Sequence, residues 1–583
     1  MFETDPQACF VSPRHEKRFI RCRGEVIANC ADEVGPALAE VEAAVARGLF
    51  AAGYLAYEAA PGLSPELAVR KPDSPLPLVW FGLYEAVETV DRRWHAAEPY
   101  SLGPWTSALD NGAYQTAIER IQTYLGSGDS YQINFTFNLT APFTGSPESW
   151  FQALCRTQQA DYCAYLDLGR FKVLSASPEL FFRLDGDLLE TRPMKGTRRR
   201  SADPAEDARL RDELMASAKD RAENLMIVDL LRNDMGRISR TGSIEVTDLF
   251  TVEPYPTVWQ MTSSIKSKTG VPVPEIMRAL FPCGSVTGAP KVRSMQIIRE
   301  LEPAPRGVYC GAVGYWMPGR KAQFNVAIRT VTVDADAGIA RYAVGSGITW
   351  DSESGDEFDE CLAKAAILDT ADSGFELLET ILFDGSYFLL DRHLARLAES
   401  AGFFGIDVAV HDVEDALNNA AASMPPGPQK VRLRVSRFGT LTVQHAPAKS
   451  SSRIRLALSE SPVDRHNVFL HHKTTRREVY DRALAAHPNA DDVLLWNSCG
   501  EITETCFGNV VADIDGKLVT PPVHCGLLPG TMRAELLDRG VIREMVIRRE
   551  DIAGANALYL INSVRKWVPA ELPAAREPAF RDG

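Results

Sequence analysis

The sequence lacks the features that several classes of protein require. It has no excess of basic residues, since 63 Lys and Arg stand against 77 Asp and Glu, for a formal net charge of −14. A general nucleic-acid binder gains affinity by neutralising phosphates, so this balance argues against that class. No apolar run approaches membrane-spanning length, and the start, Met1–Pro6, lacks a signal-peptide pattern. We therefore expect a cytoplasmic protein that binds neither nucleic acid nor membranes.

Paired cysteines are also missing. The eleven cysteines are scattered, and no two are spaced as CxxC, which disfavours a zinc ribbon or a thioredoxin-type site and favours reduced thiols.

The segment Gly284–Lys291 (GSVTGAPK) lacks the terminal Gly-Lys-Ser/Thr of a phosphate loop. It can still present backbone N–H groups and a lysine to an anion.

The length of the chain predicts more than one domain. Its 583 residues, 45% hydrophobic and 24% charged, have an ordinary globular composition but are too many for a single core. The small polar stretch Asp369–Gly374 marks a boundary. We expect a first domain over 1–370, a linker at 371–376 and a second domain over 374–583.

Hydrophobic periodicity predicts helices and strands in both domains. Helices are expected at 112–126, about 205–238, about 356–369, near 391–402 and at 477–486. Strands are expected at 131–140, 171–176, 179–184, 376–383, 387–390 and 466–470. The Asp384–Gly385 pair between two of these strands predicts a hairpin turn.

Lys195 lies in the segment Thr191–Arg198 (TRPMKGTR), where Pro193 and Gly196 predict a turn that displays its amine. Four arginines crowd it in the sequence: Arg192, Arg198, Arg199 and Arg200. Cationic neighbours lower the pKa of an amine and make it a better nucleophile. A solvated basic turn explains this segment equally well, so other parts of the chain must decide.

Two predicted helices carry carboxylates that would suit a metal ion. Glu223 ends an apolar helix stripe, where a carboxylate is costly to bury without a cationic partner. Glu357, Glu360 and Lys364 share a face of the second helix. A helix-end Glu223 and an ordinary surface Glu360–Lys364 pair are the simpler explanations. Carboxylates from separate helices, with no His or Cys nearby, favour Mg²⁺.

The motifs of the first domain resemble the chorismate-utilising enzyme family, which includes component I of anthranilate synthase and of aminodeoxychorismate synthase. In the family's order they are SYQINFTF (130–137), SASPELFF (175–182), PMKGTRRR (193–200), ENLMIVDLLRNDMGR (223–237), GSVTGAPK (284–291), RGVYCGAVGY (306–315), FNVAIRT (324–330) and GDEFDECLAKA (355–365). The resemblance spans roughly 1–370 and is strongest from 112 onward.

The resemblance implies roles for the matching residues. Glu223 and Glu360 would bind Mg²⁺, with Glu357 close by. The carboxylates of chorismate would be held by Tyr309, by Arg329 and by the backbone of Gly345, Ser346 and Gly347. Thr287 and Lys291 would belong to the same pocket wall.

Two positions separate members of this family. Anthranilate synthases typically carry alanine where Lys195 stands, whereas aminodeoxychorismate synthases carry lysine. That lysine is thought to attack C2 of chorismate and expel the C4 hydroxyl, after which ammonia enters at C4. Anthranilate synthases also usually carry a histidine, associated with pyruvate elimination, where Gln260 stands. Both residues favour amination at C4 that stops at aminodeoxychorismate.

The second domain contains another set of chemistry-bearing residues. Lys473 follows the expected strand at 466–470, and Glu504 comes about thirty residues later. Thr531 stands in an N-cap context, where a helix N-terminus binds phosphate well, and Arg396 adds a cation. Each alone has a simple surface or capping explanation. Together they are the parts that pyridoxal phosphate (PLP) needs.

Five segments of the second domain resemble the fold-type IV PLP enzymes, which include branched-chain and D-amino-acid aminotransferases and aminodeoxychorismate lyases. They are LLDRHLARLAES (389–400), HKTTRREVY (472–480), NSCGEITETCFGNV (497–510), LLPGTMR (527–533) and YLINSVR (559–565). The resemblance covers about 374–573.

This second resemblance also implies roles for individual residues. Lys473 would form the covalent link to PLP and Glu504 would hold its pyridine nitrogen. Arg396 and Thr531 would bind the phosphate. Asn562 and Ser563 would line the substrate side. Because the family's usual opening stretch is shortened, the proton donor of a lyase stays open, with Thr380 as one candidate.

The two resemblances together imply an α+β protein, in which a chorismate-utilising-enzyme β-sandwich-type α/β domain is followed by a fold-type IV PLP-enzyme domain. They imply amination of chorismate at C4, then loss of pyruvate to give 4-aminobenzoate for folate synthesis. No amidotransferase nucleophile motif stands in the chain, so the resemblance implies a separate glutamine amidotransferase subunit that supplies ammonia, with free ammonium as a substitute. A homodimer through the PLP domain is expected. The alternatives are an anthranilate synthase-like first half, a transaminase second half and a non-enzymatic binding module.

Overall fold

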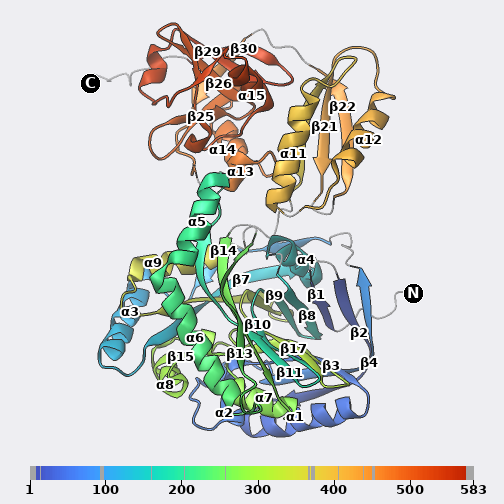
Figure 1. The fold of residues 1–583 in the computed structure, drawn as a ribbon, viewed down its shortest axis with the longest axis vertical. Helices are drawn as coiled ribbons and strands as arrows, with labels where there is room; N and C mark the ends of the chain where they lie inside the picture. The colour runs from blue at the N-terminus through green and yellow to red at the C-terminus, as the bar shows by residue number, and fades with distance from the viewer. Residues whose placement is uncertain are drawn as a thin grey trace. The chain divides into compact units, whose positions relative to one another are not determined.

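The structure, a computed structural model, describes residues 8–12, 15–91, 98–158, 160–201, 204–255, 258–365, 368, 375–404, 406–436, 439–448, 453–465 and 467–572. The chain divides into two compact units (Figure 1). The first unit contains residues 1–199 and 211–372, and the second contains residues 200–210 and 373–583. Of the expected linker, residues 371–374 lie outside the described part.

One antiparallel sheet runs through the whole first unit. Its strands are β1 (Ala8–Val11), β2 (His15–Ala28), β3 (Phe50–Leu55), β4 (Val79–Asp91), β5 (Tyr100–Leu102), β6 (Thr106–Ser107), β7 (Gln132–Gly145), β8 (Tyr162–Leu168), β9 (Phe171–Ser177), β10 (Leu180–Asp185), β11 (Leu188–Arg192), β12 (Met194–Arg199), β13 (Glu245–Pro254), β14 (Val258–Lys268), β15 (Gly288–Ala289), β16 (Ala312–Met317), β17 (Lys321–Val326), β18 (Thr330–Asp334) and β19 (Ile339–Ile348).

The pairing of these strands makes two halves joined through β1. On one side of β1 the strands follow the order β2, β4, β3, β16, β17, β10, β11 and β14, and β14 also pairs with β12 and β13. On the other side the order is β8, β9, β18, β19 and β7. Lys195 therefore belongs to one half, on β12, and Gly347 to the other half, on β19.

Helices cover both halves of this sheet. They are α1 (Ala31–Ala46), α2 (Ala60–Leu63), α3 (Asn111–Gly126), α4 (Pro147–Gln158), α6 (Ala218–Gly236), α7 (Val273–Leu280), α8 (Lys291–Leu301) and α9 (Ser354–Ala365), with 3-10 turns at η1 (Tyr57–Ala59) and η2 (Gly284–Val286). Helix α5 (Pro204–Ala216) includes residues of both units. Helices α1, α6 and α7 share one hydrophobic core with β3, β4, β16 and β17. Helices α3, α4 and α8 share a second core with β7, β9 and β19.

The second unit contains two sheets. The smaller has β20 (Leu377–Phe383), β21 (Gln429–Val435) and β22 (Leu441–Pro447), and its core includes side chains of α11 (Leu390–Phe404) and α12 (Val410–Ala421). The larger has β23 (Ile454–Leu458), β24 (Asp492–Trp496), β25 (Ile502–Thr505), β26 (Asn509–Ile514), β27 (Lys517–Thr520), β28 (Arg543–Glu544), β29 (Ala557–Asn562) and β30 (Lys566–Glu571). The remaining elements are α13 (Val468–His471), α14 (Glu478–Ala486), α15 (Thr531–Asp538), η3 (Val523–Cys525) and η4 (Asp551–Gly554). The predicted α+β class is confirmed.

Three element predictions were wrong. The helix expected over 205–238 is two helices, because Ser217 has an extended backbone and caps α6 by accepting a hydrogen bond from the Asp220 N–H. The strand expected at 466–470 is partly helix α13, capped by Asn467, while residue 466 lies outside the described part. The strand expected at 387–390 is reduced to a single bridge between Tyr387 and Phe383 before α11 begins.

Candidate active sites

The sequence predicts a turn at Lys195, but the structure places this residue on a strand. It is the second residue of β12, whose pairing with β14 shifts register between Met194 and Thr197. Gly196 has φ of +91°, a conformation that favours glycine. The ladder is therefore irregular at Lys195 and Gly196, and irregularities of this kind, like β-bulges, commonly change the direction of a side chain.

Three of the four arginines near Lys195 in the sequence pair with carboxylates, which differs from the crowd of unpaired cations that the sequence predicts. Arg192 pairs with Glu253, Arg198 with Asp220 at 2.9 Å, and Arg200 with Asp207 at 2.8 Å. The side chain of Arg199 lies outside the described part. The partner acids come from β13, α5 and α6, so the residues next to Lys195 in sequence could not reveal them.

The carboxyl group of Glu179 lies within the electrostatic reach of Lys195. Glu179 precedes β10, is 3% exposed and accepts a hydrogen bond from the Ser285 hydroxyl at 2.7 Å. Burial raises the pKa of Glu179 to about 7, although Ser285 and the positive charge of Lys195 oppose that rise. A carboxyl group that can gain or lose a proton near neutral pH therefore stands beside the proposed nucleophile.

Gly347 leaves room for the Lys195 amine. A Cβ placed on this residue of β19 would lie 2.8 Å from Lys195 Nζ and would also collide with the amide of Gln132. Gln132 begins β7 and is 2% exposed, and neither amide atom has a hydrogen-bond partner among the described residues. Two unpaired polar atoms beside the lysine mark a place for a polar ligand, because burying them without partners is costly.

The three glutamates proposed for Mg²⁺ do not form a ligand cluster. Burial raises the pKa of Glu223, and the charges of Lys195 and Glu357 act on it. Glu360 pairs with Lys364 at 2.6 Å, and this pair lowers its pKa even though loss of hydration acts in the opposite direction. Glu357 accepts a hydrogen bond from the Ser352 hydroxyl at 2.8 Å. The part of the chain that the structure describes contains no group of three acidic, His or Cys side chains that could hold a metal.

The residues expected to grip carboxylates occupy neighbouring positions around β19. Gly345 accepts a hydrogen bond from Lys364 at 2.9 Å, and Ser346 bonds the Tyr114 hydroxyl at 3.0 Å. Tyr309 is buried, and burial raises its pKa, so its hydroxyl stays a donor. Arg329 donates to Gln158 at 3.3 Å.

Thr287 and Lys291 have structural partners. The Thr287 hydroxyl is buried and bonds the carbonyls of Cys283 and Gly284. Lys291 pairs with Asp234 at 2.7 Å and donates to the Leu280 carbonyl. Both side chains therefore hold the GSVTGAPK loop in shape, and the Thr287 carbonyl binds the Asn134 N–H of β7.

Gln260 holds the segment that carries Lys195. Its amide donates to the Gly196 carbonyl at 2.8 Å and accepts from the Thr197 hydroxyl at 2.9 Å. The side chain thus bonds the two residues that follow Lys195. A glutamine here positions the lysine and offers no base.

In the second unit, Lys473 lies between α13 and α14, and its carbonyl binds the Leu378 N–H of β20. Burial, followed by the charge of Arg396, lowers the pKa of Lys473 to about 8 against the opposing charge of Glu379. A larger fraction of this amine is therefore neutral and nucleophilic near pH 7 than for an exposed lysine.

Glu504 lies on β25, within electrostatic reach of the Lys473 amine. It is 4% exposed, accepts a hydrogen bond from the Tyr480 hydroxyl at 2.7 Å and contacts the Asn509 amide at 3.4 Å. Burial raises the pKa of Glu504 to about 8. A cationic ring nitrogen placed against it would lower that pKa and keep the carboxylate charged.

Arg396 is held in place by Glu379, an acid that the sequence analysis did not single out. Its guanidinium makes two hydrogen bonds to Glu379, at 2.9 and 2.7 Å, and one to the Pro529 carbonyl at 3.2 Å. His393 bonds the same carboxylate at 2.6 Å. All three side chains are buried. Glu379, which His393 also contacts, holds the guanidinium of Arg396 so that it reaches the loop before α15.

Thr531 is the first residue of α15, and Gly530 occupies the N-cap, so the expected cap is displaced by one position. The Thr531 hydroxyl faces His393 at 3.4 Å. Asn562 caps a turn by accepting from the N–H groups of Val564 and Arg565, and Ser563 donates to the Thr380 carbonyl at 3.2 Å. Their side chains are thus engaged within the turn and with β20.

The comparisons with known proteins find a different family in each part of the chain. Residues 95–369 match the chorismate binding enzyme family, and residues 375–572 match the class IV aminotransferases. The chain is 42% identical over 262 residues to aminodeoxychorismate synthase component 1 of Klebsiella aerogenes, covering 45% of this chain and 58% of that protein. It is 38% identical over 326 residues to the same-named protein of Salmonella typhimurium, covering 52% of this chain and 71% of that protein.

A solved structure supports the fold of the first unit. Anthranilate synthase component I from Streptococcus pneumoniae aligns with a TM-score of 0.55 at 23% identity, covering 63% of this chain and 93% of that one. The chain thus joins a chorismate binding enzyme domain to a class IV aminotransferase domain. Through its first domain, it belongs to the aminodeoxychorismate synthase component 1 family. The prediction of an enzyme with these two domains is confirmed.

Proposed function

We propose that this chain makes 4-aminobenzoate from chorismate and ammonia in two steps. The first unit would aminate chorismate at C4 to 4-amino-4-deoxychorismate, and the second would eliminate pyruvate from that product. The observation that carries the proposal is the close approach of the Lys195 amine to Gly347, with the buried carboxyl group of Glu179 within electrostatic reach of that amine. Family membership and the class IV domain that follows support it.

In the first step, the Lys195 amine would attack C2 of chorismate. The ring double bond would shift and the C4–O bond would break, and Glu179, protonated near neutral pH, would donate a proton so that water leaves. Ammonia would then bond to C4 and give its extra proton to Glu179, and the C2–N bond to Lys195 would break. The balance is chorismate plus ammonia to the aminated product plus water.

Other side chains around Lys195 would position the lysine and the substrate. Gln260 holds the strand that carries the lysine. The unpaired amide of Gln132 offers hydrogen bonds to a polar ligand. Mg²⁺ fits the donor chemistry of Glu223 and Glu357, since it binds through one or two carboxylates and keeps several waters. In that case Glu360, paired with Lys364, would contribute only after that ion pair opens.

In the second step, the residues of the second unit fit PLP. Lys473 offers an amine with a lowered pKa, Glu504 a buried acid for the ring nitrogen, and Arg396 with the start of α15 a place for phosphate. PLP, when bound, would withdraw electrons from the carbon that carries the substrate's amine. Lys473, released from the cofactor when the substrate's amine takes its place, would take the proton from C4 of the substrate, and the C3–O bond would break. The departing enolpyruvate would take up one proton to become pyruvate, and the ring would become aromatic.

Two alternatives concern the separate halves. An anthranilate synthase-like first half has the fold of the aligned solved structure, but Lys195 and Gln260 argue against it. A transaminase second half agrees equally well with the class IV match. A transaminase would convert branched-chain or D-amino acids with 2-oxoglutarate. Assaying this reaction distinguishes a transaminase from a lyase in the second half.

Product analysis tests the proposal directly. The full chain, supplied with chorismate, ammonium, Mg²⁺ and PLP, should release 4-aminobenzoate and pyruvate. Lys195→Ala should block amination, and Lys473→Ala should accumulate 4-amino-4-deoxychorismate. Anthranilate as the main product, or amination that survives Lys195→Ala, would overturn it.

The source of ammonia and the assembly are also proposals. The name component 1 on the relatives supports a separate glutamine amidotransferase partner, and glutamine should replace ammonium only when that partner is present. We also expect a homodimer through the PLP unit and a cytoplasmic location. All eleven cysteines are free in the structure. None of the helices in the described ranges is long and apolar enough to cross a membrane.

A further inference from the structure

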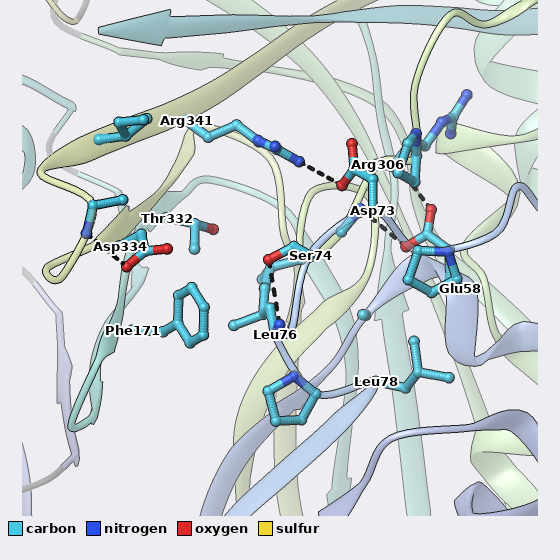
Figure 2. Close-up of a pocket in the computed structure, with 18 residues that line it drawn as sticks. Glu58, Asp73, Ser74, Leu76, Leu78, Phe171, Arg306, Thr332, Asp334 and Arg341 are labelled. Atoms are coloured by element: carbon cyan, nitrogen blue, oxygen red, sulfur yellow. Dashed lines mark hydrogen bonds and ion pairs between the residues drawn. The ribbon is translucent and has the colours of Figure 1, made fainter. Parts of the chain in front are cut away.

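A cavity of about 140 Å³ opens in the first unit, and none of the residues placed around Lys195 above lines it (Figure 2). Its walls come from the segment at 72–78, from residues 305–308 and from β18 and β19. Phe171, Leu76, Leu78 and Ile339 contribute apolar surface. A cavity of about 150 Å³ holds one benzene molecule, so this one has room for a single six-membered ring.

The mouth of the cavity carries a cation that a ligand can reach. Arg341, on β19, contacts Asp73 through a single ion pair of 3.1 Å, and the two side chains are 36% and 44% exposed. Figure 2 shows this contact between the two labelled side chains. Exposed ion pairs contribute little to stability, so a ligand carboxylate can replace Asp73 at little cost. The planar guanidinium of arginine suits a carboxylate, which it can bind through two parallel hydrogen bonds.

The polar groups elsewhere in the wall are mostly satisfied. Glu58 is 3% exposed and accepts the backbone N–H groups of Arg306 and Gly307 at 2.8 and 2.9 Å. Asp334 receives two hydrogen bonds from Arg170, at 2.9 and 2.8 Å. Asp334 stays charged because Arg170 lowers its pKa, and Glu58, whose pKa burial raises to about 7, is partly charged near neutral pH. Both disfavour a second negative charge on the ligand. A ligand with one carboxylate at the mouth and an uncharged ring inside fits this arrangement.

Arg306 connects this cavity with the residues around Lys195. It is one of the residues that line the cavity, and its guanidinium donates to the carbonyls of Val286 and Asn134, both at 2.7 Å. Val286 belongs to the GSVTGAPK loop, and Asn134 is the strand partner of Gly347. A ligand that moves the Arg306 backbone would therefore act on the glycine that leaves room for Lys195.

We propose that this cavity is a binding site for a one-ring aromatic carboxylate, held at the mouth by Arg341 with its ring against Phe171. The class includes 4-aminobenzoate, so the identity of the natural ligand rests on the proposed function. The site itself does not, because benzoate has the same ring and the same carboxylate and is not a product of the reaction.

Calorimetric titration of the PLP-loaded full chain tests the site, with benzoate, 4-aminobenzoate and aniline as probes. Benzoate and 4-aminobenzoate should bind, and aniline, which lacks the carboxylate, should not. Arg341→Gln should weaken benzoate binding by about tenfold or more, which corresponds to losing a charged hydrogen bond of about 1.5–3 kcal/mol. The matched control is Arg120→Gln, an exposed arginine of the same unit that pairs with Glu300 and should leave the Kd unchanged.

Two further measurements separate this site from the catalytic ones. The Lys195→Ala and Lys473→Ala variants should bind benzoate as the unchanged protein does. In the amination assay with ammonium, 4-aminobenzoate should change the KM for chorismate, and Arg341→Gln should remove that change. Benzoate binding that is insensitive to Arg341→Gln, or that is lost in the lysine variants, overturns the site. A failure of the proposed reaction would leave the benzoate result standing.

Discussion

Glu179 is a buried acid whose protonation state can be tested through the rate of amination. Because burial raises its pKa to about 7, the protonated form that donates to the leaving hydroxyl is lost as the pH rises through that value. We expect kcat of amination at saturating ammonia to fall above about pH 7. Glu179→Gln should lower kcat by about 10²–10⁴-fold, the usual contribution of a general acid, and remove this limb of the pH profile.

The control for Glu179 is an exposed glutamate of the same unit. Glu300 is 45% exposed and pairs with Arg120 and Tyr124 at the surface, so Glu300→Gln should keep both kcat and its pH profile. If Glu179→Gln retained the alkaline limb, another group would be the proton donor.

Glu379 is expected to stabilise the second unit because it is a buried anion held by two side chains. Removing one member of such a pair leaves an uncompensated buried charge, so Glu379→Ala should lower the free energy of unfolding by about 3–5 kcal/mol. The exposed pair Arg453–Glu571 is the matched control, with side chains 63% and 54% exposed. Glu571→Ala should cost less than about 1 kcal/mol. Urea denaturation of the PLP-free chain, followed by a probe in the second unit, measures both; equal effects would contradict the assignment.

The same carboxylate predicts how stability depends on pH. Although burial alone would raise it, Arg396 and His393 hold the pKa of Glu379 at about 2, below its ordinary value of 4.5. A group with a lowered folded-state pKa contributes stability that is present above the unfolded-state pKa and lost as the pH falls. The contribution should therefore disappear between about pH 4.5 and pH 2, and Glu379→Gln should flatten that part of the curve of unfolding free energy against pH.

At the scale of elements, Lys195 on β12, in one half of the sheet, lies against Gly347 on β19, in the other half. Gly347→Ala would put a methyl group 2.8 Å from the lysine Nζ, so the amine must move. We expect kcat/KM for amination to fall at least tenfold, in keeping with the sensitivity of catalysis to small misplacements. Gly355→Ala, in α9, meets open space and should change the rate little. Equal rates for the two variants would exclude this packing role.

The elements that periodicity predicted well are those whose own side chains bury a regular stripe. The helix expected at 112–126 is α3, where Tyr114, Ile118 and Ile121 are buried, and the strand expected at 376–383 is β20. Periodicity failed where a single polar residue decided the backbone. Ser217 separates α5 from α6, and Asn467 starts a short helix in a run rich in apolar residues.

At the scale of the whole molecule, each unit has its own hydrophobic cores and its own candidate lysine. If the intermediate is released between the two steps, Lys195→Ala and Lys473→Ala chains mixed in equal amounts should make 4-aminobenzoate, whereas neither makes it alone. The rate should rise in proportion to the concentration of the Lys195→Ala chain. A mixture that makes no product would mean that the intermediate passes only within one chain.

The sequence alone was enough to divide the chemistry between two domains and to single out Lys195 and Lys473, because these residues stand in local motifs whose order along the chain is itself informative. Glu223, Glu504 and Arg396 were proposed as candidates in the same way. Nothing local to Lys195 could show that its arginine neighbours are paired with acids of β13, α5 and α6.

Only the tertiary structure brought Glu179, Gln132 and Gly347 to Lys195, and Glu379 and His393 to Arg396. These contacts join residues far apart in the chain, and strand pairing and helix packing decide them. The pKa values that matter for catalysis follow from the same packing, because burial determines how costly a charge is and the sequence does not show which acids are buried.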